Sequence, residues 1–415
     1  MIDDYLPNSQ KSGAQMVHDL ACHLISTGHE VSLAAPAHWV DKVSLDELDG
    51  VRIYWFRSGK TKNVTKIKRA LNETLLSLRA YLALRAILRR DPHELILYYS
   101  PSIFWGPLIS YLKRIWRCPA YLILRDIFPQ WAVDAGLLSK YSPVYWYFKL
   151  FEMLSYKAAD RIGVLTPRNK KYFDNRLINM RDKTEVLYNW APTKRVAQPL
   201  NESSYGCGCA TRGGAWREKL GLQGKVVFFF GGNTGHAQDM MNVVRLAESL
   251  KHRKDAHFLL VGEGDEVDLV KREIMARELC NMTQHPGVPP SEYFRIIDEV
   301  DVGVFSLHRQ HRTHNIPGKL LGYMQYGIPI LGSVNPGNDV KEIIERYDAG
   351  LISFNGDDDA FMKNAIRLLE DPKARERMGK NGVRLLSEVF SVEKAADQVI
   401  RTCRLHSPMA SSHWQ

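Results

Sequence analysis

Apolar runs of strand length alternate with stretches of helical periodicity along almost the whole chain. Most of these runs are rich in Val, Ile, Leu and Phe without polar alternation, which is typical of strands covered on both faces. The strands are expected at 31–36, 94–100, 120–126, 160–166, 184–190, 225–232, 256–264, 301–307 and 328–333. Regular alternation of strand and helix predicts an α/β fold with doubly wound parallel sheets.

Residues 192–214 interrupt this pattern because they are rich in Pro, Ser and Gly and low in aliphatic residues. A chain of 415 residues is also long for one core. We therefore predict two Rossmann-like domains that face each other across a cleft, with residues 192–214 as the linker between them. The predicted domains are 1–191 and 215–390, and a C-terminal helix and tail, 391–415, is expected to pack back on the first domain.

The first domain is expected to lack its first strand. Residues 12–36 have the pattern of a helix, a turn at Gly28 and a strand, and only Met1 and Ile2 are available before the polar segment DDYLP to form a strand ahead of that helix. A late start or a truncated chain would explain this pattern. The alternative is a domain that simply begins differently.

Composition narrows the class of partner. The net charge of +10 suits a polyanionic partner, such as a phosphorylated substrate, an anionic membrane or nucleic acid. Basic residues gather in the first domain without a nucleic-acid recognition module, so we expect no nucleic-acid partner. The closest cysteines, Cys207 and Cys209, fit neither a zinc ribbon nor a thioredoxin motif and are assigned to a loop. MIDDYLPNSQ is not typical of a signal peptide, and prolines break the uncharged run 95–112, so we expect a cytoplasmic protein.

Two loop-to-helix junctions in the second domain indicate an anion site. The segment 228–240, FFFGGNTGHAQDM, is a strand, a glycine loop and a helix start, where backbone amides favour phosphate. Pro317 and Gly318 suit a second helix start, which would place the Lys319 ammonium beside further amides. Both junctions follow parallel strands and would converge on one diphosphate-binding crevice. Glycines kept for packing, and a lysine that points to solvent, are the alternatives.

Three further segments are ambiguous. His308, His311 and His314 lack a nearby carboxylate or cysteine, so the arginines among them favour an anion loop over a metal site. Asp126 follows a strand and could accept a proton from a sugar hydroxyl or cap a turn. The basic, leucine-rich segment 60–90 and the aromatic segment 141–156 could lie on an anionic membrane or pack on the core.

The chain resembles the family-4 retaining glycosyltransferases, which have the GT-B fold. The resemblance covers nearly the whole chain and rests on SGAQMVHDLACHLISTGHEVSLAAP, FEMLSYKAADRIGVLTPRNKKYF, GGNTGHAQDM, VGEGDE, NIPGKLLGYMQYGIPILGS and NPGNDV. Within the family it is most similar to L-fucosamine (N-acetylfucosamine) transferases of bacterial O-antigen and capsule assembly. This implies a UDP-linked sugar donor on the second domain. It also implies a lipid-diphosphate-linked saccharide acceptor on the first, with the protein peripheral at the inner face of the cytoplasmic membrane.

The resemblance also implies roles for individual residues. Lys319 and Asp126 would be catalytic, Gly13 and Arg125 would lie on the acceptor side, and no metal would be required. The donor-binding residues would be Gly232, Asn233, Gly235, Gln238, Gly287, Val288, His314, Asn315, Pro317, Gly318 and Gly322.

Two departures from the family pattern keep other functions open. The family's pair of glutamates is replaced by His314 and Gly322, and its His-Asp pair by Arg125-Asp126. A sugar-nucleotide epimerase of the same architecture, and an inactive or truncated glycosyltransferase paralogue, are the alternatives.

Overall fold

The structure is a computed structural model that describes residues 1–6, 12–61, 64–134, 136–193, 214–310 and 316–406. The chain divides into two compact units: unit 1 contains Met1–Asn189 and Val392–Gln415, and unit 2 contains Trp190–Ser391. Most of the segment predicted as a linker, 194–213, lies outside the described residues. Within the described ranges, no helix combines the length and the apolar character that a membrane span requires.

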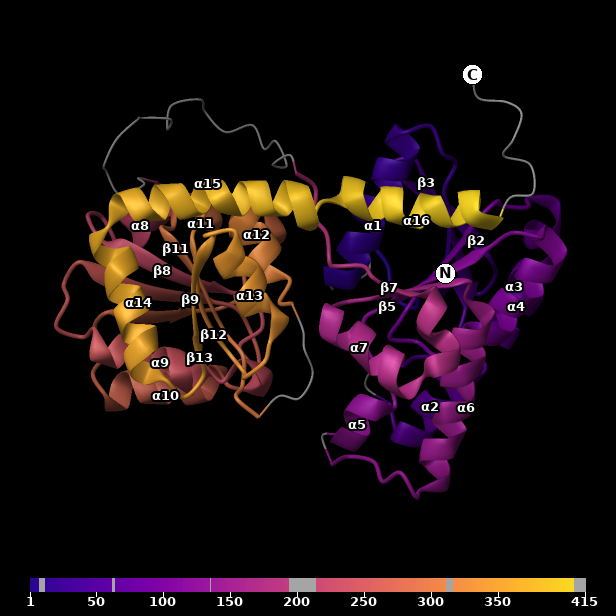
Figure 1. The fold of residues 1–415 in the computed structure, drawn as a ribbon, viewed down its shortest axis with the longest axis horizontal. Helices are drawn as coiled ribbons and strands as arrows, with labels where there is room; N and C mark the ends of the chain where they lie inside the picture. Colours follow the sequence, from indigo (N-terminus) through magenta and orange to yellow (C-terminus); the bar gives the residue numbers. More distant parts are fainter. Residues whose placement is uncertain (7–11, 62–63, 135, 194–213, 311–315, 407–415) are drawn as a thin grey trace. The chain divides into compact units, whose positions relative to one another are not determined.

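Unit 1 contains two sheets with helices around them (Figure 1). One sheet has the order β1-β3-β2 and the other the order β4-β5-β6-β7. The strands are β1 (Ser32–Ala37), β2 (Ser44–Leu48), β3 (Val51–Arg57), β4 (Ile96–Tyr99), β5 (Ala120–Leu124), β6 (Arg161–Val164) and β7 (Thr184–Val186). The helices are α1 (Ser12–Ser26), α2 (Lys66–Thr74), α3 (Leu76–Arg90), α4 (Gly106–Trp116), α5 (Gln130–Asp134), α6 (Pro143–Ala158), α7 (Pro167–Arg176) and α16 (Val392–His406).

Unit 2 is built on one six-stranded parallel sheet of order β10-β9-β8-β11-β12-β13. Its strands are β8 (Val226–Gly231), β9 (Ala256–Val261), β10 (Met282–His285), β11 (Val302–Ser306), β12 (Ile330–Val334) and β13 (Gly350–Phe354). Its helices are α8 (Ala215–Leu220), α9 (Met240–Ser249), α10 (Val267–Ala276), α11 (Pro290–Glu299), α12 (Lys319–Gln325), α13 (Asp339–Arg346), α14 (Asp358–Glu370) and α15 (Pro372–Val389).

Helices cover both faces of the unit 2 sheet, as the unbroken apolar strands predict. Val302 and Val304 of β11 join a core that includes residues of α9, α10 and α14. Gly303, between these two valines, faces the opposite side of the sheet and lies against the ring of Tyr323 in α12. The predicted doubly wound α/β architecture is therefore confirmed.

The structure corrects two details of the predicted strands. The segment 184–190 contributes only the three residues of β7, after which the chain leaves the sheet. The strands β2 and β3 form an antiparallel pair that the pattern did not reveal. Since β2 is mostly exposed, its sequence SLDEL has no apolar run to reveal it.

Met1 and Ile2 occupy the position of the expected first strand. The Met1 amino group donates to Leu97 O at 2.7 Å, and Tyr99 N donates to Met1 O at 3.0 Å. On the other side, Ile2 N donates to Ala34 O at 3.3 Å. These two residues thus lie between β4 and β1 and link the two sheets of unit 1.

Candidate active site

The loops that follow β8 and β9 bind each other through their main chains. Thr234 N donates to Glu263 O at 2.9 Å, and Glu266 N donates to Thr234 O at 3.1 Å. A Cβ atom on Gly262 would lie 1.8 Å from Gly232 O, so only glycine permits this approach. The two loops therefore form one rigid platform, which we call the loop platform (residues 232–235 and 262–266), at the carboxyl end of the sheet.

Gly262→Ala should destabilise the protein because the added methyl group pushes against main chain that cannot yield. We expect a loss of about 1–3 kcal/mol in the free energy of unfolding, measured by chemical denaturation. Gly322→Ala is a matched control, since its Cβ would make only ordinary contact with Ile297 at 3.5 Å and alanine favours the helix. Equal stability of the two variants would contradict a rigid loop platform.

Lys319 begins α12, and Tyr323 fixes this helix against the sheet. The Tyr323 hydroxyl is buried and lies 3.1 Å from both Phe229 O and Val304 O. Lys319 Nζ lies 3.3 Å from the centre of the Phe230 ring, in a cation–π contact, and donates to Gln238 Oε1 at 3.4 Å. The predicted convergence of Lys319 with the loop after β8 is therefore present in the structure.

The Lys319 ammonium is enclosed although the residue as a whole is only half-buried. Burial holds the pKa of Lys319 well below its usual range. The aromatic ring and the amide oxygen of Gln238 offer no full negative charge to offset the cost of desolvation. A bound anion would supply that charge.

The other predicted donor residues of unit 2 lie along the same edge of the sheet. A Cβ atom on Gly235 would lie 2.7 Å from Asp265 Oδ1 of the loop platform. A Cβ atom on Gly287 would lie 3.2 Å from the Glu263 side chain. Asn233 also lies beside Gly235. Pro317 is buried, Gly318 precedes Lys319 as the cap of α12, and Val288 is half-buried after β10. His314 and Asn315, together with His311 and Arg312 of the anion loop, lie outside the described residues.

The start of the helix after the glycine loop differs from the prediction. A short 3₁₀ turn, His236–Gln238, intervenes, and Asp239 adopts a left-handed conformation with φ of 46° before α9 begins. The first amide of α9, Met240 N, donates to Glu266 Oε2 at 3.2 Å. A carboxylate thus already accepts from the first amide of α9, and Lys319 meets this junction through Gln238 of the 3₁₀ turn.

Sequence reasoning overlooked the acids and the hydroxyl of the loop platform. Asp265 Oδ1 accepts from His236 N at 3.3 Å, and Glu266 also holds α9. Thr234 is fully buried, and its Oγ1 has no hydrogen-bond partner among the described residues. The acids of VGEGDE were visible in the sequence, but their partners are more than twenty positions away. Only the fold reveals these pairings.

The predicted acceptor-side residues of unit 1 gather around Tyr99. A Cβ atom on Gly13, at the start of α1, would lie 2.7 Å from the Tyr99 hydroxyl. Burial raises the pKa of the Tyr99 hydroxyl, and the Arg125 guanidinium beside it opposes that rise. Gly13, Tyr99 and Arg125 therefore form one group at the carboxyl ends of β4 and β5.

Arg125 is committed mainly to the main chain. Its Nη1 donates to Leu187 O at 2.7 Å and its Nη2 to Tyr188 O at 3.3 Å, beyond the end of β7. Burial lowers the pKa of Arg125, and the nearby hydroxyls and Asp126 oppose that shift. This geometry gives Arg125 a positioning role for the strand ends and for its neighbour Asp126.

Asp126 combines solvent access with a perturbed carboxyl group. Its accessible area makes it exposed, yet protein atoms crowd it enough to raise its pKa, against the opposing charge of Arg125. A carboxyl group with a raised pKa and access from solvent can exchange protons with a bound hydroxyl.

Among the residues that the structure describes, His18, Cys22 and Asp49 are close enough to hold a metal ion. His18 is buried, its Nε2 lies 2.8 Å from Asp49 Oδ2, and its Nδ1 lies 2.8 Å from the Tyr5 hydroxyl. Both ring nitrogens thus take part in a hydrogen-bond chain that ties α1 to the turn after β2. This group is remote in sequence from every predicted site residue except Gly13.

Comparisons with known proteins agree with this architecture. The model of the glycosyl transferase 4-like domain matches residues 13–190, and the model of glycosyl transferases group 1 matches residues 214–384. The fold also resembles the structure of Anabaena HepE in complex with UDP and glucose, with a TM-score of 0.65, 14% identity, and coverage of 97% of this chain and 99% of that one.

Two curated proteins are similar in sequence. The probable glycosyltransferase WbjE of Pseudomonas aeruginosa is 26% identical over 229 residues, which is 55% of this chain and 54% of that protein. The alpha-D-kanosaminyltransferase of Streptomyces kanamyceticus is 25% identical over 187 residues, 44% of this chain and 46% of that protein. The chain thus spans about half the length of the curated relatives it matches. With one glycosyltransferase domain matched before residue 191, a second matched from residue 214 onward, and the two-domain fold in place, the chain belongs to the GT-B glycosyltransferases.

Proposed function

We propose that the protein transfers an N-acetylamino sugar from a UDP-linked donor to a lipid-diphosphate-linked saccharide during the assembly of a bacterial surface polysaccharide. The observation that carries this proposal is the enclosed Lys319 ammonium, which lies beside the loop after β8 and faces no carboxylate in its contacts with Phe230 and Gln238. A diphosphate would complete that environment. The HepE structure contains UDP and glucose, which supports a UDP-linked donor.

In the proposed reaction the acceptor hydroxyl attacks the anomeric carbon from the face that the UDP leaves, so the configuration is retained. The bond from the anomeric carbon to the β-phosphate oxygen breaks, and the acceptor proton is released. Lys319 neutralises the charge that develops on the departing diphosphate, and the amides near Gly235 and Gly318 add hydrogen bonds. These groups take the place of a metal ion, so we propose that the transfer is metal-independent.

The remaining donor residues would hold the nucleotide and the sugar. Asn233 and Gln238 would fix the donor, and the main chain at Gly287 and Val288 would contact uracil. Gly322 adds no carboxylate at the position where the family pattern has glutamate. The sugar would therefore be selected by other polar groups along this edge of the sheet. The kanosaminyl group named for one relative is an amino sugar, which supports an amino-sugar donor, and the sequence resemblance makes N-acetylfucosamine the first such sugar to test.

An exposed apolar patch on unit 1 supports a membrane-bound acceptor. The patch, which we call the α6 patch, consists of Tyr141, Val144, Trp146, Tyr147, Leu150 and Leu154, and the exposed fractions of these residues range from 37% to 95%. Tyr147 shares a hydrogen bond with Thr74 at the end of α2, so α6 and α2 lie side by side (Figure 1). Exposed apolar side chains of this number mark an interaction surface more often than a solvated face.

One basic helix adjoins the α6 patch. Lys68 and Arg69 on α2 are exposed, and Thr74 at the end of the same helix bonds Tyr147 of the patch. Apolar side chains that enter the headgroup region, with basic residues beside them, are typical of proteins that bind anionic membranes. We therefore propose that an anionic bilayer is the partner of this surface, at the inner face of the cytoplasmic membrane.

Leu150→Glu should weaken binding to anionic vesicles by about tenfold, because it removes an apolar contact and adds a repelled charge. Co-sedimentation with vesicles of phosphatidylglycerol and phosphatidylethanolamine measures this. Met275→Glu adds the same charge at a 78% exposed site on α10 of unit 2 and should leave binding unchanged. Equal binding by the two variants, or no binding by the wild type, would contradict the membrane role of the α6 patch.

Product analysis separates the transferase from its alternatives. A transferase incubated with UDP-N-acetylfucosamine and bacterial membranes gives free UDP and a labelled lipid-linked saccharide in equal amounts. An epimerase gives an isomeric UDP-sugar and needs no membranes. Donor binding without turnover would favour an inactive paralogue.

A further inference from the structure

Three side chains with different metal-binding atoms converge beside α1. His18 and Cys22 are four positions apart on this helix, so both side chains leave it on the same face. Cys22 Sγ lies 3.4 Å from His18 Nε2, and Asp49 Oδ2 lies 2.8 Å from the same nitrogen. The three atoms all lie within 4.8 Å of one another. Imidazole nitrogen, thiolate sulfur and carboxylate oxygen are the atoms that bind Zn²⁺ in proteins.

The spacing of these atoms is close to that of a tetrahedral zinc site. Bonds of about 2.0–2.3 Å to zinc place neighbouring ligand atoms about 3.3–3.6 Å apart. The distance from Cys22 Sγ to His18 Nε2 already falls in this range. The Asp49 carboxylate would have to withdraw from His18 by roughly 0.5 Å, and its side chain is 67% exposed to solvent. The group therefore needs little rearrangement to enclose an ion.

The main chain delivers the ligands from two separate elements. Asp49 and Gly50 form the two-residue turn of the β2–β3 hairpin, with φ of 50° and 79°. A turn this short is fixed by the strands on either side of it, so the Asp49 carboxylate has a defined position. His18 and Cys22 come from α1. An ion bound by all three residues would cross-link α1 to the hairpin.

Tyr5 orients the His18 ring for metal binding. Its hydroxyl lies 2.8 Å from His18 Nδ1, and both residues are buried. A hydroxyl can accept a hydrogen bond from Nδ1–H as well as donate one to the unprotonated nitrogen. When Tyr5 accepts, the lone pair of His18 is on Nε2, which faces Cys22 and Asp49. Metal-binding histidines commonly have an outer hydrogen-bond partner of this kind on their second nitrogen.

The charges near the thiol favour a cation. Burial raises the pKa of Cys22, and the negative charges of Asp49 and Asp19 raise it further. A divalent ion would offset these charges and displace the thiol proton, which passes to solvent as the sulfur–metal bond forms. Since Cys22 is half-buried and Asp49 is exposed, an ion can enter from solvent and keep a water molecule in the fourth position.

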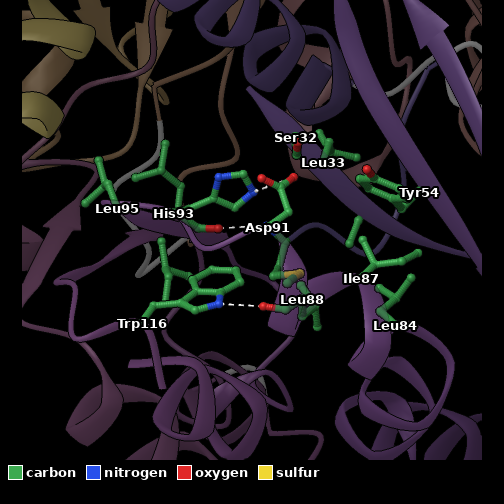
Figure 2. A pocket seen from close by; sticks show the side chains of 14 residues that line it. Ser32, Leu33, Tyr54, Leu84, Ile87, Leu88, Asp91, His93, Leu95 and Trp116 are labelled. Atoms are coloured by element: carbon green, nitrogen blue, oxygen red, sulfur yellow. Dashed lines mark hydrogen bonds and ion pairs between the residues drawn. The ribbon is translucent and has the colours of Figure 1, made fainter. Parts of the chain in front are cut away.

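A second imidazole–carboxylate pair shows what the group beside α1 adds. His93 Nε2 and Asp91 Oδ2 lie 3.9 Å apart beside a cavity of about 60 Å³ (Figure 2). No cysteine and no further carboxylate is among the described residues that line this cavity, and Asp91 already faces Arg52 at 3.8 Å. A cation there would have two protein ligands and would compete with an arginine. The group beside α1 has a third ligand, the thiolate.

We propose that His18, Cys22 and Asp49 form a zinc site, which we call the α1 site, that fastens α1 to the β2–β3 turn of unit 1. The sugar transfer proposed above requires no metal ion, so the ion would stabilise unit 1 without a part in catalysis. This inference is therefore independent of the proposed function.

Zinc titrations of the full chain test the α1 site. The parent protein for these experiments is stripped with a chelator and carries Cys207→Ser and Cys209→Ser, which removes the other closely spaced thiols of the sequence. We expect calorimetry to show one Zn²⁺ bound per chain, and Tm to rise by about 5 °C when Zn²⁺ exceeds its Kd a hundredfold. Mg²⁺ should not bind, because thiolate and imidazole are poor ligands for it.

Substitutions in the parent separate an ion from a simple hydrogen-bond chain. Asp49→Asn keeps a residue that tolerates the left-handed conformation and an oxygen that accepts from His18, but it removes the anionic ligand. Asp49→Asn and Cys22→Ser should each lower Zn²⁺ affinity more than Tyr5→Phe, for which loss of an outer partner predicts about 10–100-fold. Cys280→Ala, at an exposed cysteine of unit 2, is the matched control and should leave affinity unchanged.

Co²⁺ in place of Zn²⁺ gives a direct signature of the thiolate ligand. A thiolate bound to Co²⁺ produces a charge-transfer band in the near ultraviolet, which we expect in the parent and in Cys280→Ala but not in Cys22→Ser. No Zn²⁺ binding by the parent, equal affinity in the parent, Asp49→Asn and Cys22→Ser, or a band that survives in Cys22→Ser, would each overturn the proposal.

Discussion

Lys319→Ala should lower kcat for sugar transfer by about a hundredfold or more, because the departing diphosphate loses its charged partner. Removal of one preorganised contact of this kind typically costs about 2.7–4 kcal/mol in the barrier. In the structure the Lys319 ammonium lies 3.3 Å from the Phe230 ring centre and donates to Gln238 Oε1. Steady-state release of UDP measures the effect.

Two controls separate chemistry from structure in this prediction. Lys319 contributes no ion pair that the structure records, and its removal relieves a desolvated cation, so Tm of Lys319→Ala should equal or exceed that of the wild type. Gln238→Leu removes the neutral partner and should cost less than tenfold. A Lys319→Ala variant with wild-type kcat and normal Tm would contradict the role of the lysine.

Donor binding should also depend on pH through Lys319. Burial holds the pKa of this lysine well below its usual range in the free protein, and a bound diphosphate raises that pKa by favouring the charged form. The Lys319 contact therefore contributes fully to UDP affinity at a pH below the lowered pKa. This contribution declines as the pH rises through that pKa. Calorimetry across that range should show the decline in the wild type and a flatter profile in Lys319→Ala. Identical profiles would contradict this linkage.

Asp126→Asn should lower kcat by about 10²–10⁴-fold if the carboxylate accepts the proton of the acceptor hydroxyl. The carboxyl group is accessible to solvent, and crowding by protein atoms raises its pKa. Activity should then fall at acidic pH, as the carboxylate takes up a proton, and this acidic limb should vanish in the variant. A pH profile of kcat/KM measures both effects.

The variant Arg125→Lys separates a loss of the proton acceptor from a loss of its placement, and is compared with Asp126→Asn. Lysine cannot make the paired contacts that Arg125 makes with Leu187 O and Tyr188 O, so the strand ends and Asp126 should lose precise placement. We expect a lower Tm and a moderate loss of kcat with the acidic limb retained. An acidic limb that is unchanged in Asp126→Asn would assign the proton to another acceptor.

The alternation of apolar strands and helices was sufficient to predict the fold, because every strand of the unit 2 sheet except β10 and β13 has an unbroken apolar run in the sequence. The β2–β3 pair escaped prediction because SLDEL lies on an exposed edge, where no buried face imposes a pattern. The length of β7 was overestimated because Leu187 and Trp190 are buried, so the apolar pattern continues beyond the last residue of the strand.

The candidate site was predictable where the chain needs glycine or a helix start, and unpredictable where partners are distant in sequence. The glycines of the loop platform were visible as a motif, and the structure explains Gly262 by its approach to Gly232 O. Tyr99 could not be singled out, because a tyrosine at the end of an apolar strand is ordinary until Gly13 and Arg125 are seen beside it.

The most direct test of the proposed function is the rate of UDP release from UDP-N-acetylfucosamine and related UDP-N-acetylamino sugars, measured with and without acceptor-bearing membranes. We expect UDP release with at least one donor and only when the membranes are present, and we expect Lys319→Ala, but not Met275→Glu, to lower the rate at least a hundredfold. Donor binding by calorimetry with no release under any condition, or release that Lys319→Ala leaves intact, would contradict the proposed function.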